Sequence, residues 1–379
     1  MEQLYLDHAA TSWPKPNVIK EAMMLALEQS GNPGRSGHSL SLNAARIIHQ
    51  ARHTLAQFFN APSSAQIVFT LNATDSLNMA IKGMVKPGDH VITTCLEHNS
   101  VLRPLYALKN AGQIELTVLE LQDGTVQPEQ FAAAIRPDTA LVVTTHASNV
   151  IGAIIDIAAV SRICQKAGVK LLLDAAQTAG VLPIDVQELN LAAMACAGHK
   201  GLLGPQGTGA LYVRADVELG FWREGGTGSI SHEVYQPPFM PDRLEAGTPN
   251  TIGIAGLGAS VKYLSEIGID AIRQKEAALT EQLRAGLKRI PGLTLYTPDI
   301  SMGVFSINLE GFDSAGLSVA LEREHGILTR PGLHCAPLAH KAIGTYPQGT
   351  TRISIGYSTT EAEVEQVIKA LEELSRQVR

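Results

Sequence analysis

The sequence predicts an α/β protein with a mainly parallel sheet in a large domain and a smaller α+β domain at the C-terminal end. Short β-rich runs alternate with helical stretches, the pattern of a parallel sheet that is covered by helices on both faces. A length of 379 residues exceeds what one hydrophobic core usually supports. The alternation then stops at residues 225–253, a long stretch rich in Gly, Pro and Ser. A loop of this length in a compact domain is usually functional, unless it is a linker.

Several β-rich runs predict the strands of the large domain in chain order. The runs that predict them are QIVFT (66–70), HVITT (90–94), IELTVLEL (114–121), ALVVTT (140–145), KLLLD (170–174), the apolar LAAMACA (191–197) and GALYV (209–213). In such sheets ligands bind beyond the carboxyl ends of the strands. Polar residues that follow these strands are therefore site candidates, among them Asn72, Thr74, Glu97, His98, His146, Asn149, Asp174, Gln177 and Lys200.

The C-terminal part is expected to hold a helical stretch at 261–288, strands GVFSINL and TTRISIG, and a last helix. That helix begins with a capping box from Thr360 to Glu363 and carries an apolar stripe from Val364 to Leu374. The predicted domains are 16–255 and 256–379, and residues 1–15 are expected to pack on the second.

Composition excludes several classes of function. The net charge of −6 and the absence of a basic run argue against a nucleic-acid or anionic membrane surface as the main partner. The N-terminus lacks a basic segment followed by an apolar stretch, and no apolar window reaches the length of a membrane span, so we expect a cytoplasmic protein. The four cysteines form no C-x-x-C pair, which predicts neither a disulfide framework nor a metal site.

One lysine has unusual surroundings. Lys200 lies in the stretch AGHKGLLGPQGTG, where it is the only charged residue among five glycines. A lysine acts as a nucleophile when a useful fraction of it is neutral, which an apolar setting promotes by lowering the pKa. A phosphate-binding loop of the Walker type is excluded because Gly201, rather than Ser or Thr, follows the lysine.

Nearly the whole chain resembles the class V aminotransferases, a family of pyridoxal 5'-phosphate (PLP) enzymes, and within it the cysteine desulfurases and selenocysteine lyases. The motifs that carry the resemblance are YLDHAATSWPKP, GNPGRSGH, EHNSV, HASNVIGAI, DAAQTAG, GHKGLLGPQGTGALYV, EAGTPN, RPGLHCAP and TRISIGYSTT. Their number, order and spacing are specific, although each alone is weak. The resemblance implies fold type I of the PLP-dependent transferases and a homodimer.

The resemblance also implies a set of cofactor-binding residues. Lys200 would hold PLP as a Schiff base, and Asp174 would pair with the pyridine nitrogen. Further contacts would come from Gln177 and Asn149 to the phenolic oxygen, His98 on the ring face as a catalytic and stacking residue, and Thr74, His199 and Thr248 to the phosphate, Thr248 from the second subunit. The chain departs from many relatives at Ala197 and Gly198, where a phosphate-binding Ser is common, so a backbone N–H or another Ser would have to substitute.

Cys335 in RPGLHCAP matches the cysteine that attacks substrate sulfur, and a thiolate is the reactive form. Arg330 and His334 are close in sequence and are expected to favour that thiolate. Arg352 matches the arginine that clamps the substrate carboxylate, for which its planar fork is suited. Further candidates for the substrate pocket are Arg330, Arg35, Asn149 and His38, with Gly34 departing from the His of close relatives.

The resemblance implies conversion of L-cysteine to L-alanine, with sulfur transferred to Cys335 as a persulfide. The short segment before Cys335 suggests slow turnover, accelerated by a thiol reductant or by a sulfur-acceptor protein. Three alternatives stay open: a selenocysteine lyase, which takes L-selenocysteine; a class V PLP lyase, epimerase or aminotransferase that does not use Cys335; and a non-enzymatic binding protein or sulfur-relay scaffold.

Overall fold

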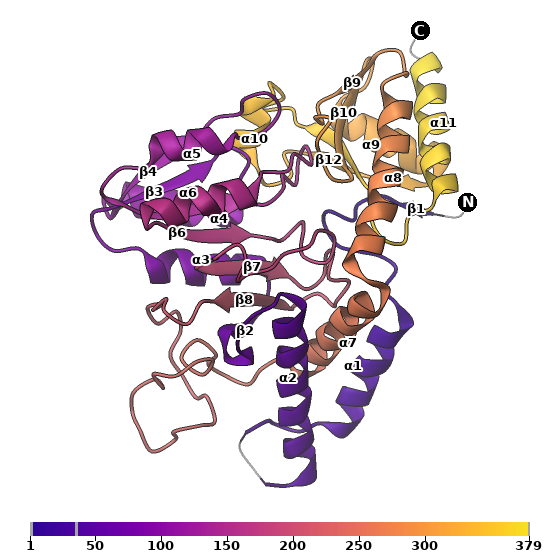
Figure 1. Ribbon diagram of the computed structural model, residues 1–379. Helices are drawn as coiled ribbons and strands as arrows, with labels where there is room; N and C mark the ends of the chain where they lie inside the picture. Colours follow the sequence, from indigo (N-terminus) through magenta and orange to yellow (C-terminus); the bar gives the residue numbers. More distant parts are fainter. Residues whose placement is uncertain (1–2, 35–36, 378–379) are drawn as a thin grey trace.

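The computed structural model describes residues 3–34 and 37–377 (Figure 1). Its centre is a seven-stranded sheet in the order β2-β8-β7-β6-β5-β3-β4. The strands are β2 (Ile67–Thr70), β3 (Asp89–Thr94), β4 (Ile114–Leu119), β5 (Thr139–Thr145), β6 (Lys170–Asp174), β7 (Ala193–Ala197) and β8 (Gly209–Val213). β7, β6, β5, β3 and β4 are mutually parallel, whereas β8 is antiparallel to both of its neighbours. The prediction of a mainly parallel sheet is confirmed.

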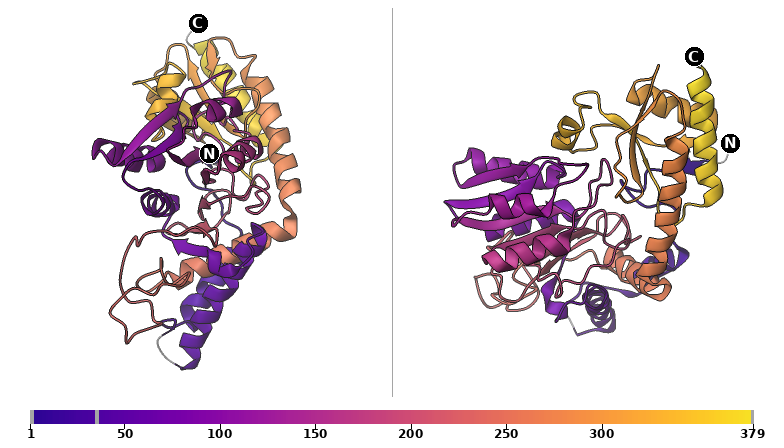
Figure 2. Two further views of the ribbon diagram at one scale, coloured as in Figure 1. Left: turned by 60° about the vertical axis from the view of Figure 1, so that its left-hand side comes forward. Right: turned by 45° about the horizontal axis from the view of Figure 1, so that its top comes forward.

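The central strands are buried on both faces, which explains their continuous apolar sequences. Side chains alternate along a strand, so Leu171 and Leu173 of β6 enter one core and Leu172 enters the other. The first core is covered by α2 (Ser39–Phe58), α5 (Pro128–Ala134), α6 (Ile157–Ala167) and α7 (Thr251–Ile267), and the second by α3 (Ala73–Met84) and α4 (Asn99–Asn110). Helices on both faces are visible in Figures 1 and 2.

The helical stretch expected at 261–288 is two helices that meet at a glycine. α7 ends at Ile267, and α8 (Ile269–Leu287) begins directly after Gly268. Gly268 has φ +88, a left-handed conformation that glycine adopts without the steric cost of a Cβ. α7 packs against α2 and against α1 (Asn17–Gln29), whereas α8 runs toward the C-terminal part (Figure 1).

The C-terminal part contains an antiparallel sheet in the order β12-β13-β10-β9. Its elements are β9 (Leu293–Leu295), β10 (Val304–Leu309), α9 (Ser314–His325), β11 (Ile327–Leu328), β12 (Arg330–Gly332), α10 (Pro337–Ala342), β13 (Thr350–Ser354) and α11 (Glu361–Gln377). The expected capping box starts α11, because Thr360 N donates to Glu363 Oε2 at 2.7 Å and Glu363 N donates to Thr360 Oγ1 at 3.3 Å.

The N-terminal segment joins this C-terminal part. β1 (Leu4–Tyr5) pairs with β11, and Leu4 and Leu6 are buried in the same core as α8, α9 and α11. The expected limit between residues 255 and 256 lies inside α7, whose Leu257 and Val261 belong to the core of the large sheet. The domain limits therefore stay a prediction.

The long loop expected at 225–253 corresponds to residues 214–250, which contain no helix or strand, whereas residues 251–253 already belong to α7. Within residues 3–34 and 37–377, no helix is long and apolar enough to cross a membrane.

Candidate active site

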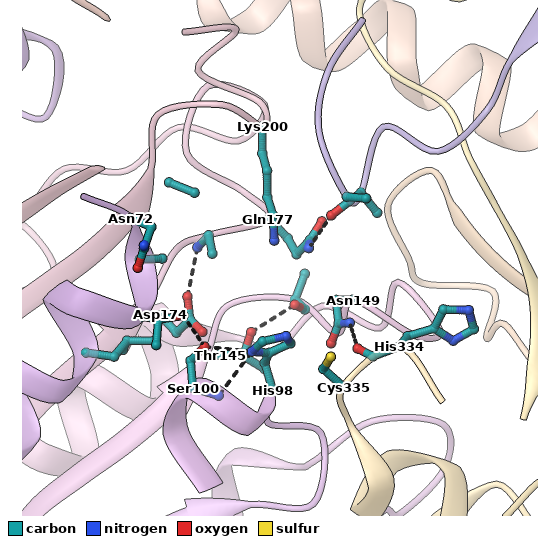
Figure 3. A pocket seen from close by; sticks show the side chains of 18 of the residues that line it. Asn72, His98, Ser100, Thr145, Asn149, Asp174, Gln177, Lys200, His334 and Cys335 are labelled. Atoms are coloured by element: carbon teal, nitrogen blue, oxygen red, sulfur yellow. Dashed lines mark hydrogen bonds between the residues drawn. The ribbon is translucent and has the colours of Figure 1, made fainter. Parts of the chain in front are cut away.

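A cavity of about 210 Å³ lies at the carboxyl ends of β5, β6 and β7, where it meets the C-terminal part. The side chains of Lys200, Asp174, His98, Asn149 and Cys335 surround one space there (Figure 3). The predicted residues that line the cavity are Thr74, His98, Asn149, Asp174, Gln177, His199, Lys200, Arg330, Cys335 and Arg352. The fold thus collects residues from almost the full length of the chain.

Lys200 follows β7 in a turn that packs closely on the preceding loop. A Cβ on Gly201 would lie 2.6 Å from the backbone oxygen of Ala179, so a glycine is required for this approach. Burial lowers the pKa of Lys200 to about 8, and the positive charges of the two nearby arginines act in the same direction while Asp174 opposes them. With a pKa near 8, roughly a tenth of the amine is neutral at pH 7. This fraction is what a nucleophilic lysine requires.

Asp174 is the last residue of β6 and is buried. Its Oδ1 accepts a hydrogen bond from Ala176 N at 2.9 Å. Burial raises the pKa of Asp174, whereas the bond from Ala176 and the charge of Lys200 lower it. Among the described residues no Lys or Arg forms an ion pair with this carboxylate. A cationic ring nitrogen in the cavity would therefore supply the partner that a buried carboxylate needs.

The N-terminus of α3 forms one end of the cavity. Asn72 caps the helix by accepting from Asp75 N at 2.9 Å, and the Oγ1 atom of Thr74 lies 2.6 Å from Ser100 Oγ. The first-turn N–H groups of a helix lack intrahelical partners and favour an anion. His199 Nδ1 is buried and has no hydrogen-bond partner among the described residues. These groups fit a phosphate.

Ser100 was missed as a site residue. It lines the cavity beside Thr74 and provides a hydroxyl group, which Ala197 in the same cavity lacks. The motif EHNSV could have indicated Ser100 as a site residue, because Ser100 follows His98 by two residues.

His98 caps α4 and is neutral. Its Nδ1 accepts a hydrogen bond from Ser100 N at 3.1 Å, so the ring proton must be on Nε2. Burial lowers the pKa of His98 to about 4, and the charge of Lys200 contributes in the same direction. A neutral imidazole on the cavity wall is compatible with stacking on a ring. Gln177 lies nearby and donates from Nε2 to the backbone oxygen of Ala9 at 3.1 Å.

Arg352 on β13 is almost fully buried and is paired with a residue that sequence reasoning missed. Its Nη2 donates to Asp7 Oδ1 at 2.6 Å, and its Nη1 donates to the backbone oxygen of Asn149 at 3.1 Å. Arg352 Nε is buried and has no partner among the described residues. Arg330 lies directly across from Arg352 in the β12–β13 register. Two guanidinium groups on one wall provide an anion site for a carboxylate.

Cys335 is exposed at the cavity wall on a strained loop. His334 and Cys335 have φ values of 49° and 57°, a left-handed conformation that costs non-glycine residues about 1 to 3 kcal/mol each. Asn149 Nδ2 donates to the backbone oxygen of His334 at 2.7 Å, and Asn99 N donates to the backbone oxygen of Cys335 at 2.7 Å. These bonds hold the loop in place.

The expectation that His334 favours a thiolate at Cys335 does not hold in this structure. The His334 ring points away from the Cys335 sulfur (Figure 3), and both ring nitrogens are hydrogen-bonded elsewhere. Burial lowers the pKa of His334 to about 3, so the ring carries no positive charge near neutral pH.

Among the described residues, the candidates Glu97, His146, His38 and Thr248 do not line the cavity, and neither does Gly34. His38 caps α2 by accepting from Ser41 N at 3.3 Å, and Gly34 lines a separate hollow formed mainly by residues 224–237. Thr248 is exposed in the long loop, and its assignment to a second subunit stays a prediction. Arg35 lies outside the described residues. In the described part of the chain no cluster of His, Cys, Asp and Glu is arranged for a metal ion.

The mainly parallel sheet and the cavity that contains Lys200 are features of the class V aminotransferases, and comparison with known proteins gives the same family. The family model for class V aminotransferases matches residues 4–367, and the chain belongs to this family.

The names of individual relatives are more specific than the description of the family. A probable cysteine desulfurase of Methanothermobacter thermautotrophicus is 36% identical over 386 residues, which cover 99% of this chain and 95% of the relative. A cysteine desulfurase of an Enterobacter species is 35% identical, with 98% and 93% covered. The apo structure of the cysteine desulfurase from Thermococcus onnurineus superposes with a TM-score of 0.93 at 32% identity and covers 99% of this chain and 95% of its own.

Proposed function

We propose that this chain is a PLP-dependent cysteine desulfurase that converts L-cysteine to L-alanine and transfers the sulfur to Cys335. The observation that carries the proposal is the shared cavity of Lys200, Asp174 and Cys335. A PLP lyase or aminotransferase requires the first two residues but not an exposed cysteine on the same wall. The naming of several relatives as cysteine desulfurases supports the same activity.

The residues present fit PLP. The phosphate would lie at the N-terminus of α3 with Thr74, Ser100 and His199, whose Nδ1 has no hydrogen-bond partner in the part of the chain that the structure describes. Asp174 would hold the ring nitrogen, His98 would lie on the ring face, and Gln177 and Asn149 would contact the phenolic oxygen. Asn149 Oδ1 is buried and has no hydrogen-bond partner within residues 3–34 and 37–377, and Asn149 Nδ2 already donates to the backbone oxygen of His334. When bound, the cofactor supplies an electron sink for charge that develops on the substrate.

The residues of the chain would then perform three tasks. Arg352 and Arg330 hold the substrate carboxylate, and Lys200 Nζ in its neutral form accepts the proton from Cα. The Cys335 thiolate attacks the substrate sulfur. An S–S bond forms, the C–S bond breaks, and its electron pair stays on Cβ, which takes up a proton. The overall reaction converts L-cysteine and the Cys335 thiol to L-alanine and the Cys335 persulfide, so atoms and electrons balance.

The proposal includes a homodimer in which Thr248 of each chain reaches the phosphate of the other site. The long loop that carries Thr248 and the exposed apolar side chains of α1 support an assembly of this kind. We further propose a cytoplasmic enzyme whose persulfide is cleared by a thiol reductant or by an acceptor protein, because a short ordered loop cannot carry sulfur far.

The test is a single turnover of the purified enzyme. One equivalent of L-cysteine without reductant should give alanine and add 32 Da to the peptide that contains Cys335, the mass of one sulfur atom. L-Selenocysteine in the same assay compares the two substrates through kcat/KM. A colourless protein with no visible absorption after incubation with PLP would overturn the cofactor assignment. A preference for selenocysteine of several orders of magnitude would identify the lyase instead.

A further inference from the structure

We propose that His340 is a positioning residue for Cys335 and acts through the ring of His334. The proposal rests on the proposed function, because it assigns His340 to the placement of the sulfur-accepting cysteine. His340 is fully buried on α10 and is not among the residues that line the cavity. No sequence motif and no step of the site chemistry assigns a role to His340.

A chain of hydrogen bonds runs from the cysteine loop into the protein. His334 Nε2 lies 2.9 Å from the backbone oxygen of Arg330, and His334 Nδ1 lies 3.2 Å from His340 Nε2. His340 Nδ1 lies 2.7 Å from Thr345 Oγ1. The two rings are nearly stacked, with centroids 5.4 Å apart and planes inclined by 30°. All three side chains are buried, and water does not compete for the two bonds that His340 makes to His334 and Thr345.

The chemistry of the partners fixes each proton. A carbonyl oxygen only accepts, so the bond to Arg330 places the proton of His334 on Nε2. The neutral ring then presents a bare Nδ1, which accepts from His340 Nε2. His340 in turn has a bare Nδ1, which accepts from the hydroxyl of Thr345. Burial keeps both rings neutral, since it lowers the pKa of His334 to about 3 and of His340 to about 4.

This series of hydrogen bonds positions Cys335 because it fixes the adjacent residue, His334. His334 and Cys335 are both in the left-handed region, and such a conformation persists only where the surroundings fix it. Asn149 holds the carbonyl of His334, and Asn99 holds the carbonyl of Cys335. The His334 ring is the side-chain anchor of the loop, and His340 supplies the donor for one of its two nitrogens. Without that donor, His334 Nδ1 would be buried and unsatisfied, which favours rearrangement of the loop.

Three substitutions at His340 separate the hydrogen bond from simple packing. The amide nitrogen of Gln reaches about as far as Nε2 of His and can donate to His334, whereas that of Asn corresponds to Nδ1 and falls short. We expect H340A and H340N to slow the addition of 32 Da to Cys335 about tenfold in a single turnover of the PLP-loaded enzyme. H340Q should stay within about threefold of the wild type. The matched control is K341A, at an exposed residue next to His340 on the same helix, which should leave the rate of sulfur addition unchanged.

Two further readouts test the positioning role. Exchange of the Cα proton of L-alanine in D2O requires PLP and Lys200 but not Cys335, so it should be unchanged in all the variants. Hydrogen exchange of the Ala336 amide, which donates to Leu333 O at 2.9 Å, should accelerate in H340A and H340N and recover in H340Q. Unchanged sulfur transfer in H340A, an equal loss of Cα exchange, or failure of H340Q to recover would each overturn the proposal.

The outcome is separable from the proposed function. If Cys335→Ala still forms alanine at the wild-type rate, the nucleophile assignment fails. The effect of His340 on the loop is then decided by amide exchange alone, because that measurement does not depend on the reaction.

Discussion

Arg352, which lines the cavity, forms an ion pair with Asp7, in which Arg352 Nη2 donates to Asp7 Oδ1 at 2.6 Å. The pair joins β13 to the N-terminal segment across almost the entire sequence. Because Asp7 takes one edge of the guanidinium, the proposed function requires that a substrate carboxylate would bind to the remaining donors of Arg352 together with Arg330 on the facing strand.

Replacing Asp7 with Asn should destabilise the protein. Only 2% of the Arg352 side chain is exposed, so removal of the anion leaves a buried guanidinium without its charged partner. Because Asp7 is partly exposed, we expect the free energy of unfolding in urea to fall by about 2 kcal/mol rather than by the full cost of a buried charge. The matched control is D138N, which breaks the exposed pair of Asp138 with Arg136 and should leave the free energy of unfolding nearly unchanged. Equal effects of the two substitutions would contradict this account.

The reactivity of Lys200 toward PLP should depend on pH with a midpoint near 8. Only the neutral amine is a nucleophile, and its fraction rises as the pH passes through the lowered pKa of about 8. We therefore expect covalent attachment, trapped with borohydride in cofactor-free protein, to accelerate from pH 6 to 8 and to level off above pH 9. Lys200→Ala should give no trapped product at this site. Asp174→Asn should move the midpoint to lower pH, because the negative charge of Asp174 favours the protonated amine. A midpoint near that of an ordinary lysine would show that burial does not lower this pKa.

The sequence predicted the strands well because the central sheet is buried on both faces. The run KLLLD corresponds to β6 without a shift, and AMACA within LAAMACA corresponds to β7. The break at Gly268 was missed because the helical pattern resumes immediately on the other side of it. A single glycine within a helical pattern is often tolerated, so periodicity alone does not locate such a break.

The site was predictable where a residue has a local motif and not where it depends on a distant contact. Asp174 ends one strand and Lys200 follows another, and the residues around each predict these strands. Asp7 could not be connected to Arg352, because their contact depends on how the N-terminal segment packs on the C-terminal sheet. The orientation of the His334 ring likewise depends on His340 and on the backbone conformation of the loop.

Cys335→Ser should separate sulfur transfer from the chemistry at Cα. A hydroxyl is a far weaker nucleophile toward sulfur than a thiolate, so we expect alanine formation from L-cysteine to fall by about three orders of magnitude. Exchange of the Cα proton of L-alanine should be retained, because Lys200 is unchanged. The control is Cys164→Ser, at a buried cysteine away from the cavity. Alanine formation at the wild-type rate by Cys335→Ser would refute the role of this thiol.

The exposed face of α1 should take part in dimerisation. Met24, Leu25 and Leu27 are 55%, 53% and 58% exposed, an apolar cluster on a helix whose Ile19 and Ala26 pack inward. Leu27→Asp should raise the dimer dissociation constant at least about tenfold in sedimentation equilibrium, because a carboxylate would be desolvated in the interface. Ile300→Asp, at an exposed residue in another part of the molecule, is the control. An unchanged dimer in Leu27→Asp would place the interface elsewhere.

Glu276 should make stability depend on pH in a direction that is unusual for a carboxylate. It is 6% exposed on α8 and lines a cavity of about 320 Å³ together with Val181, Leu182 and Met302. Burial raises its pKa to about 8. The folded state therefore keeps a proton that the unfolded chain, with a pKa near 4.5, releases. Its contribution to stability is fully present below pH 4.5 and is lost as the pH rises through 8.

Glu276→Gln removes this linkage, because the amide is neutral at every pH and resembles the protonated carboxyl in shape. We expect the variant and the wild type to differ by less than about 1 kcal/mol at pH 5, and the variant to be more stable by about 3 kcal/mol at pH 8. Urea unfolding at the two pH values measures the difference, in which the titration of all other groups cancels. Glu266→Gln, at an exposed carboxylate on the adjoining helix α7, should give less than about 0.5 kcal/mol at either pH. A wild type that is more stable than Glu276→Gln at pH 8 would mean that the carboxylate is ionised and paired, which contradicts the burial argument.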